Sequence, residues 1–213
     1  MYEARVMGSV RDSISGKPLI QPVQFQVGEQ IVEVEEGFFD FELAFGTHRV
    51  FIAADGFKDY ENSVLLFRPL ETLYYSLEPC ETGWLIRLVY AEAGGESYLG
   101  KVGVAASVLN RVKSPSYPGD IVGVIFQRVA GYVQYSPVAD GRLYLYPGPF
   151  DPASEKKAYL ECVDAVKEAL EGADPTDGAV GFYNYHTVSY NNWVRKQPTT
   201  VDIGNHRFYR ERS

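Results

Sequence analysis

Residues 84–95 read Trp-Leu-Ile-Arg-Leu-Val-Tyr-Ala-Glu-Ala-Gly-Gly, and the pattern of the chain changes at this stretch. Trp84, Leu85, Leu88 and Val89 are spaced as neighbours on one face of an α-helix, and they are all apolar. The two glycines that follow end the helical pattern. The stretch therefore predicts the point at which a strand-rich segment gives way to a helical one.

The segment before this helix, residues 1–80, is predicted to form an all-β domain. Apolar and polar residues alternate in short runs that are separated by Gly, Pro and Asp, as expected for half-buried strands. The expected strands are residues 4–10, 23–27, 30–34, 38–43, 48–53, 63–66 and 72–77. About seven short antiparallel strands in a segment of this length indicate a β-sandwich.

The segment from residue 81 to residue 213 is predicted to form a mostly helical α+β domain. Further helices are expected at residues 98–113, at 121–127 and between Asp151 and Gly172. Extended segments are expected at 180–185 and 207–210, with a long aromatic loop region at 129–149. The whole chain is therefore predicted to have two domains, 1–80 and 81–213.

The formal charge of −8 is unevenly divided along the 213 residues. Residues 1–80 hold 6 basic and 13 acidic residues, a net of −7, whereas residues 81–213 have a net of −1. Clustered basic residues are what sequence-independent nucleic-acid binding needs, so we expect no nucleic-acid partner. No stretch approaches the roughly 18–20 apolar residues of a membrane helix. The N-terminus lacks a basic start followed by an apolar core, so no signal peptide is expected.

Glu92 is the candidate catalytic residue. It follows Leu85 by seven residues and Leu88 by four, so helical spacing puts its carboxylate on the apolar face in the last turn. The helix dipole does not favour an anion at that end, and partial burial raises the pKa of a carboxyl group. A carboxyl group that stays protonated near neutral pH suits general acid catalysis. The alternative is a solvated carboxylate at a frayed helix end.

A longer set of motifs surrounds Glu92. Residues 88–96 read Leu-Val-Tyr-Ala-Glu-Ala-Gly-Gly-Glu, and the pattern continues through segments 97–112, 120–127, 133–137, 174–184, Trp193 and 203–209. In order and spacing, these segments resemble the spore cortex-lytic cell wall hydrolase family (SleB-type). The resemblance implies a lysozyme-like enzyme without a cofactor that cuts the glycan strands of peptidoglycan at the bacterial cell wall or spore cortex. It also implies that Glu92, in the Tyr-Ala-Glu-Ala motif, is the catalytic acid. Gly94 stands where this family usually has Arg.

The number of nearby carboxylates decides between reaction types. Glycosidases that hydrolyse use a second carboxylate at a defined separation from the first. Glu96 is nearest in sequence, but two glycines separate it from Glu92, so we expect it to support the turn. Without a second carboxylate, the resemblance implies lytic transglycosylation, in which Glu92 acts first as acid and then as base. Two alternatives stay open: a peptidoglycan-binding module with a decayed site, and a zinc peptidase.

Sugar binding needs flat apolar faces together with neutral polar groups. The second segment holds 12 of the 16 tyrosines and both tryptophans. The candidate substrate-binding residues are Gln134, Tyr135, Tyr183, Asn184, Tyr185, Trp193 and His206. The alternative is that half of the aromatic residues pack the core. His186 and His206 are 20 residues apart and lack the spacing of zinc ligands, so no metal site is expected.

Turn motifs in the first segment follow a recognisable order, at residues 10–18, 37–41, 46–50 and 54–57. They resemble the carboxypeptidase-regulatory-like (transthyretin-like) β-sandwich over residues 4–79. The resemblance implies a spacer or docking domain. Because bacterial walls are largely anionic, the acidic segment is expected to meet a protein partner rather than the wall.

Overall fold

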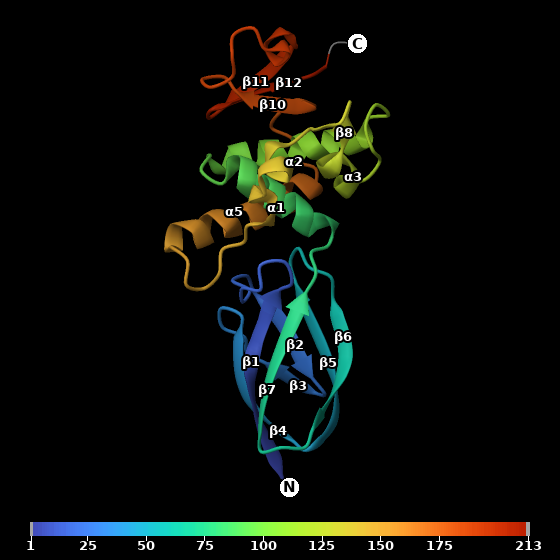
Figure 1. Ribbon diagram of the computed structural model, residues 1–213, viewed down its shortest axis with the longest axis vertical. Helices are drawn as coiled ribbons and strands as arrows, with labels where there is room; N and C mark the ends of the chain where they lie inside the picture. The colour runs from blue at the N-terminus through green and yellow to red at the C-terminus, as the bar shows by residue number, and fades with distance from the viewer. Residues whose placement is uncertain (1, 212–213) are drawn as a thin grey trace. The chain divides into compact units, whose positions relative to one another are not determined.

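The computed structural model describes residues 2–211 and divides into two compact units. The first unit is Met1–Gly83 with Tyr146–Lys156, and the second is Trp84–Leu145 with Lys157–Ser213. Figure 1 shows that the first unit holds strands β1–β7, whereas the helices and the later strands belong mostly to the second. The sequence pattern does not indicate that a segment as late as 146–156 returns to the first unit.

The first unit contains two sheets whose apolar faces share one core. One sheet has the strand order β4-β1-β7 and the other β3-β2-β5-β6. Between ring centroids, Phe25 of β2 lies 4.9 Å from Phe39 of β4 and 5.5 Å from Tyr75 of β7. The strands are β1 (Glu3–Asp12), β2 (Val23–Val27), β3 (Gln30–Val32), β4 (Phe38–Ala44), β5 (Gly46–Ala54), β6 (Tyr60–Leu66) and β7 (Leu70–Leu77).

One strand pair corrects the expectation of purely antiparallel strands. β1 pairs with β4 antiparallel, but it pairs with β7 in parallel, with Val10 opposite Tyr75. A parallel pair needs a long connection, which the five intervening strands provide. Alternation of apolar and polar residues predicts that a segment is a strand, but it does not encode the direction of the partner strand. The antiparallel expectation was therefore wrong for this pair.

The returning segment Tyr146–Lys156 is fixed to the first unit by polar contacts. The Tyr146 hydroxyl donates to Gln21 Oε1 at 2.5 Å, and Tyr146 is 2% exposed. Lys17 Nζ forms an ion pair with Asp151 at 2.7 Å. The first unit is consequently built from two pieces of chain that are far apart in sequence.

The second unit is mostly helical and carries a small sheet of order β10-β12-β11. Gly103 of α2 lies against this sheet, where a Cβ atom would come within 2.9 Å of the Phe208 ring. The small residue thus allows the close approach of helix and sheet that Figure 1 shows. The helices are α1 (Glu81–Ala93), α2 (Tyr98–Lys113), α3 (Ile121–Phe126), α4 (Ser136–Asp140) and α5 (Ala153–Leu170), with 3-10 helices η1 (Arg142–Tyr144) and η2 (Trp193–Lys196). The strands are β8 (Arg128–Val129), β9 (Tyr132–Val133), β10 (Gly181–Asn184), β11 (Thr199–Ile203) and β12 (His206–Tyr209).

The second unit differs from its predicted pattern in two places. The region 129–149, expected to be loop, contains β9, α4 and η1. Strand β11 was not expected, because only Ile203 of its five residues is buried and the apolar signal is weak. The helix predicted at 98–113 is confirmed as α2. Within residues 2–211, no helix has both the length and the apolar character needed to cross a membrane.

Candidate active site

Glu92 lies in the last turn of α1, one residue before the helix ends at Ala93. Leu85, Leu88 and Val89 are fully buried along this helix, whereas Glu92 is half-buried. The helix brings the carboxyl group to the edge of the core rather than into bulk solvent. This position agrees with the spacing of apolar residues in the sequence.

The carboxyl group of Glu92 has a pKa of about 7. Burial is the largest cause, because it penalises the charged form; the positive charge of Arg142 lowers the pKa, and the negative charge of Asp140 raises it. Among residues 2–211, the carboxyl oxygens of Glu92 have no hydrogen-bond or ion-pair partner. A carboxyl group of this kind can give up or accept a proton near neutral pH.

Arg142 is a site residue that the sequence reasoning missed. Its Nη1 donates to the backbone oxygen of Ala91 at 2.7 Å, one residue before Glu92. Its Nε donates to Asp140 Oδ2 at 2.9 Å and its Nη2 to Ser136 Oγ at 3.0 Å. The contact with Ala91 spans 51 residues of sequence, so no local pattern could reveal it.

Tyr135, a predicted substrate-binding residue, is packed beneath the site. It is 4% exposed, and burial raises its pKa to about 12. The Arg111 guanidinium lies 5.0 Å from the centre of the Tyr135 ring, and the charge of Glu92 also acts on the tyrosine. Arg111 is itself buried and was not singled out from the sequence. Tyr135 therefore lines the floor near Glu92 and offers little surface to a ligand.

Strand pairing brings three other predicted residues together. Asn184 of β10 lies directly opposite His206 of β12, and Tyr183 is next to Asn184. Tyr183 and His206 are 7% and 6% exposed, and the His206 ring packs 4.9 Å from Phe182 between centroids. Burial lowers the pKa of His206, although the charge of Glu96 acts in the opposite sense. Only Asn184 of these three keeps an accessible side chain.

The remaining predicted residues keep exposed surface. Trp193 is 55% exposed, and its ring meets Tyr209 edge-on at 6.1 Å. Gln134 is exposed and donates to the backbone oxygen of Tyr132 at 3.2 Å. Tyr185 is half-buried, with the Arg207 guanidinium 5.4 Å from its ring centre. These side chains have the accessible faces that contact with a sugar requires.

Glu96 is occupied in holding a turn. Its carboxylate accepts hydrogen bonds from the backbone amide of Asn205 at 3.1 Å and from the Asn205 side-chain amide at 2.9 Å. Burial by itself raises the pKa of Glu96, but these hydrogen bonds and the charge of His206 outweigh burial and lower the pKa overall. Glu96 therefore remains ionised and is not free to act as a second catalytic carboxylate.

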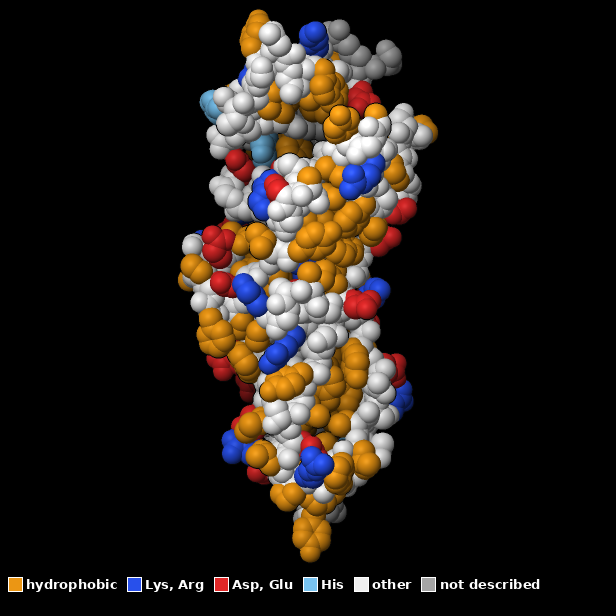
Figure 2. Space-filling model, viewed as in Figure 1, with side chains coloured by type: hydrophobic (Ala, Val, Ile, Leu, Met, Phe, Trp, Pro, Cys, Tyr) orange, Lys and Arg blue, Asp and Glu red, His pale blue; other side chains and the backbone are white. Residues whose placement is uncertain are grey.

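The surface near the C-terminal sheet is hollowed, and the possible metal ligands among the described residues are scattered. Figure 2 shows a hollow in the displayed face between the C-terminal sheet and the helices next to it, with charges of both signs at its edge. Across residues 2–211, no group of three or more His, Cys, Asp or Glu side chains is arranged to hold a metal ion.

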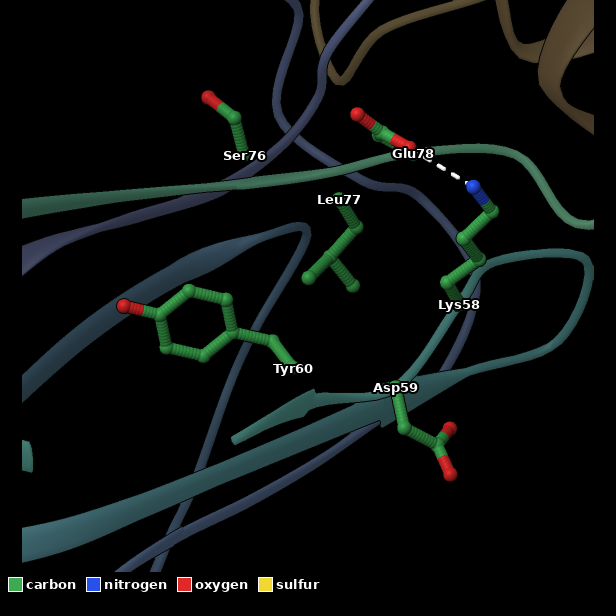
Figure 3. Close-up of a pocket in the computed structure, with 6 residues that line it drawn as sticks. All are labelled: Lys58, Asp59, Tyr60, Ser76, Leu77 and Glu78. Carbon is green, nitrogen blue, oxygen red and sulfur yellow. Dashed lines mark hydrogen bonds and ion pairs between the residues drawn. The ribbon is translucent and has the colours of Figure 1, made fainter. Parts of the chain in front are cut away.

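The first unit has a separate hollow of about 240 Å³. It is lined by Lys58, Asp59, Tyr60, Ser76, Leu77 and Glu78 (Figure 3). Lys58 Nζ pairs with Glu78 at 2.8 Å, while the Asp59 carboxylate points away from that pair. Because its facing charges neutralise each other, this hollow is a weaker candidate for catalysis than the surroundings of Glu92.

Known proteins resemble the second unit. The family model described as Cell Wall Hydrolase matches residues 95–209, so Glu92 lies just outside the matched stretch. The spore cortex-lytic enzyme of Halalkalibacterium halodurans is 38% identical over 124 residues, which are 58% of this chain and 33% of that protein. The spore cortex-lytic enzyme of Bacillus cereus is 41% identical over 120 residues, which are 56% of this chain and 40% of that protein. The chain thus matches about a third to two fifths of the length of these curated relatives.

A solved structure also matches. The catalytic domain of the germination-specific lytic transglycosylase SleB from Bacillus anthracis is 38% identical. The match has a TM-score of 0.48 and covers 61% of this chain and 93% of that chain.

Proposed function

Because the chain belongs to the cell wall hydrolase family, we propose that it cleaves the glycan strands of peptidoglycan and that Glu92 is the catalytic acid. The observation that carries this proposal is the state of the Glu92 carboxyl group. It is half-buried, has a pKa of about 7 and has no hydrogen-bond partner among residues 2–211. Such a group is protonated in a large fraction of molecules at neutral pH and is free to meet a substrate oxygen.

The reaction type that fits best is lytic transglycosylation. Glu92 donates its proton to the glycosidic oxygen as that bond breaks. The resulting carboxylate then takes the proton of the muramic acid 6-hydroxyl as this oxygen attacks the anomeric carbon of the same sugar. Hydrolysis needs a second carboxylate to activate water or to attack the sugar. Two carboxylates do not serve: Glu96, which is close to Glu92 in sequence, binds Asn205, and Asp140, whose charge acts on Glu92, binds Arg142.

The glycan strand is proposed to contact accessible side chains, namely Asn184, Tyr185 and Trp193 around the C-terminal sheet and Gln134 just after β9. Buried Tyr135, Tyr183 and His206 then act as the packed support beneath them. The proposed place of action is the bacterial cell wall or the spore cortex. A lysozyme-like fold for the second unit belongs to the same proposal.

The first unit is proposed to be a transthyretin-like β-sandwich that acts as a spacer or binds a protein partner. Its two sheets with a shared aromatic core support the architecture. Its strong negative charge supports a role away from the anionic wall.

The test is digestion of purified sacculi and of spore cortex with the wild type and with Glu92→Gln. We expect the substitution to lower the rate by at least about 10²–10⁴, because general acid–base help is lost while the shape is kept. Mass spectrometry of the wild-type products should give anhydromuramic ends. The matched control is Glu171→Gln, since Glu171 is an exposed glutamate just after the end of α5.

Three outcomes contradict parts of the proposal. Near-normal activity of Glu92→Gln removes Glu92 from the role of acid. Hydrated muramic acid as the only product rules out transglycosylation. Binding to sacculi without release of fragments by the wild type indicates a non-catalytic module.

A further inference from the structure

The carbonyl end of α1 needs partners from outside the helix. The last four carbonyl groups of an α-helix receive no hydrogen bond from an amide of the same helix. Together they form the negative end of the helix dipole. In α1 the backbone oxygen of Ala91 accepts a hydrogen bond from Arg142 at 2.7 Å. Ala91 is the residue before Glu92, so this contact restrains the turn from which the Glu92 side chain extends.

Arg142 is itself held rigidly. Its Nε and Nη2 donate to Asp140 and Ser136, and its own backbone amide donates to Asp140 Oδ1 at 3.0 Å. Gly141 lies between Arg142 and Asp140 at a φ of +86°, which turns the chain so that both can meet. One planar guanidinium group therefore ties two segments together, α1 and the stretch from α4 to η1. A lysine ammonium, with one flexible nitrogen, could not hold three acceptors in this fixed arrangement.

We propose that Arg142 is a positioning residue for Glu92. Arg142 fixes the place of the catalytic carboxyl group because it binds the carbonyl end of α1 to the α4–η1 segment. The inference rests on the proposed catalytic role of Glu92 and goes beyond it. Arg142 does not need to touch the substrate in order to act.

Arg142 also changes the pKa of Glu92. Its positive charge favours the carboxylate and lowers the pKa of Glu92, whereas Asp140 has the opposite effect. Within residues 2–211, Tyr135 is a further titratable group that interacts electrostatically with Glu92. Replacement of Arg142 by a neutral residue therefore raises the pKa of Glu92, and the alkaline limb of the rate profile moves to higher pH.

The test compares Arg142→Gln and Arg142→Lys with the wild type on sacculi. Arg142→Gln should lower kcat by up to about 10²-fold, because a small misplacement of a reacting group has effects of that size. Arg142→Lys keeps the positive charge, so the alkaline limb of its rate profile should stay near the wild-type pH. It should still lower kcat, because the hydrogen bonds of the guanidinium group to Ala91, Asp140 and Ser136 are not all kept. The matched control is Arg210→Gln, since Arg210 pairs with Asp177 at 3.0 Å and is 52% exposed, compared with 44% for Arg142.

A second readout does not depend on activity. Carboxyl ¹³C NMR titration of the full chain gives the pKa of Glu92 directly, with its signal identified by its absence from Glu92→Gln. The pKa should rise in Arg142→Gln and stay unchanged in Arg210→Gln. If Arg142→Gln fails to fold, judged by circular dichroism, then Arg142→Lys and Ser136→Ala provide the test, and both should lower kcat.

The outcomes separate this inference from the proposed function. Wild-type kcat and an unchanged Glu92 pKa in folded Arg142→Gln overturn the positioning role, even if Glu92→Gln is inactive. Full activity of Glu92→Gln overturns the proposed catalytic role instead. A fall in kcat for Arg142→Gln that equals the fall for Arg210→Gln also overturns the inference.

Discussion

Burial at Glu92 links its proposed role as catalytic acid to the stability of the protein. The folded protein holds the pKa of this carboxyl group at about 7, compared with 4.5 for an ordinary glutamate. Ionised Glu92 is therefore less favourable in the folded state than in the unfolded chain. The protein keeps the group half-buried at the end of a helix, where the dipole does not favour its charge and no hydrogen bond from residues 2–211 stabilises it.

This linkage predicts how stability depends on pH. Below about pH 4.5 both states are protonated, and Glu92 has no effect. As the pH rises from 4.5 to 7, the unfolded chain releases this proton while the folded protein retains it, so the free energy of unfolding falls. Glu92→Gln removes the effect, and we expect it to be more stable than the wild type at pH 8 by about 1–3 kcal/mol, with no difference at pH 4. Urea denaturation at the two pH values measures this.

Glu96→Gln is the matched control for that measurement. The pKa of Glu96 is lowered in the fold, so its carboxylate stabilises the protein above its unfolded pKa and loses this effect as the pH falls through its folded pKa. Glu96→Gln should therefore be less stable than the wild type at pH 8, opposite in sign to Glu92→Gln. Equal stability of wild type and Glu92→Gln at pH 8 contradicts the raised pKa.

The sequence predicts the place of Glu92 but not of its neighbours. Its position on the apolar face follows from helical spacing over seven residues, because the helix itself enforces that geometry. Arg142 reaches it only through the packing of distant segments, and so do Arg111 and the buried Tyr135. Residue types alone likewise could not separate the tyrosines that pack from those that stay accessible.

At the scale of elements, the turn between β11 and β12 is the connection that joins the sheet to the start of α2. Glu96, just before α2, accepts two hydrogen bonds from Asn205 in this turn. Gly204 precedes Asn205 with a φ of +59°, and a Cβ atom there would collide with the Glu96 carboxylate. The glycine thus permits both the backbone conformation and the close approach of Glu96.

Gly204→Ala should therefore destabilise the protein. We expect a loss of about 2 kcal/mol or more in the free energy of unfolding, because steric strain and a displaced Glu96 add together. The matched control is Gly131→Ala, since Gly131 also has a positive φ in a strand turn but open space around it. That control should lose only about 1 kcal/mol. Equal losses in urea denaturation would mean that the contact with Glu96 contributes nothing.

The elements themselves were predicted with uneven success for physical reasons. Long helices such as α2 repeat their apolar signal over several turns, so the sequence predicts their bounds well. α4 and η1 are too short for such a repeat, and β11 is mostly accessible. The parallel pairing of β1 with β7 depends on how the whole sheet closes, which no local pattern contains.

At the scale of the whole molecule, the two structural units differ more in net charge than the two sequence segments 1–80 and 81–213 do. The unit formed by residues 1–83 and 146–156 holds 7 basic and 16 acidic residues, a net of −9. The remaining residues hold 13 basic and 12 acidic residues, a net of +1. A unit with little net charge can approach an anionic polymer without strong repulsion. The charge division therefore agrees with the proposal that the second unit, rather than the first, binds the wall.

The first unit is built from two pieces of chain, and Tyr146 binds the second piece, residues 146–156, to the first. The Tyr146 hydroxyl donates to Gln21 and accepts from the backbone amide of Ile20 at 2.9 Å. Tyr146→Phe removes the partner of the buried Gln21 oxygen and of the part-buried Ile20 amide, so we expect a loss of about 1–3 kcal/mol and faster hydrogen exchange across residues 146–156. Tyr144→Phe is the control, because Tyr144 is 42% exposed and belongs to the second unit. Unchanged exchange in Tyr146→Phe would mean that the ion pair of Lys17 with Asp151 holds the segment without the hydroxyl.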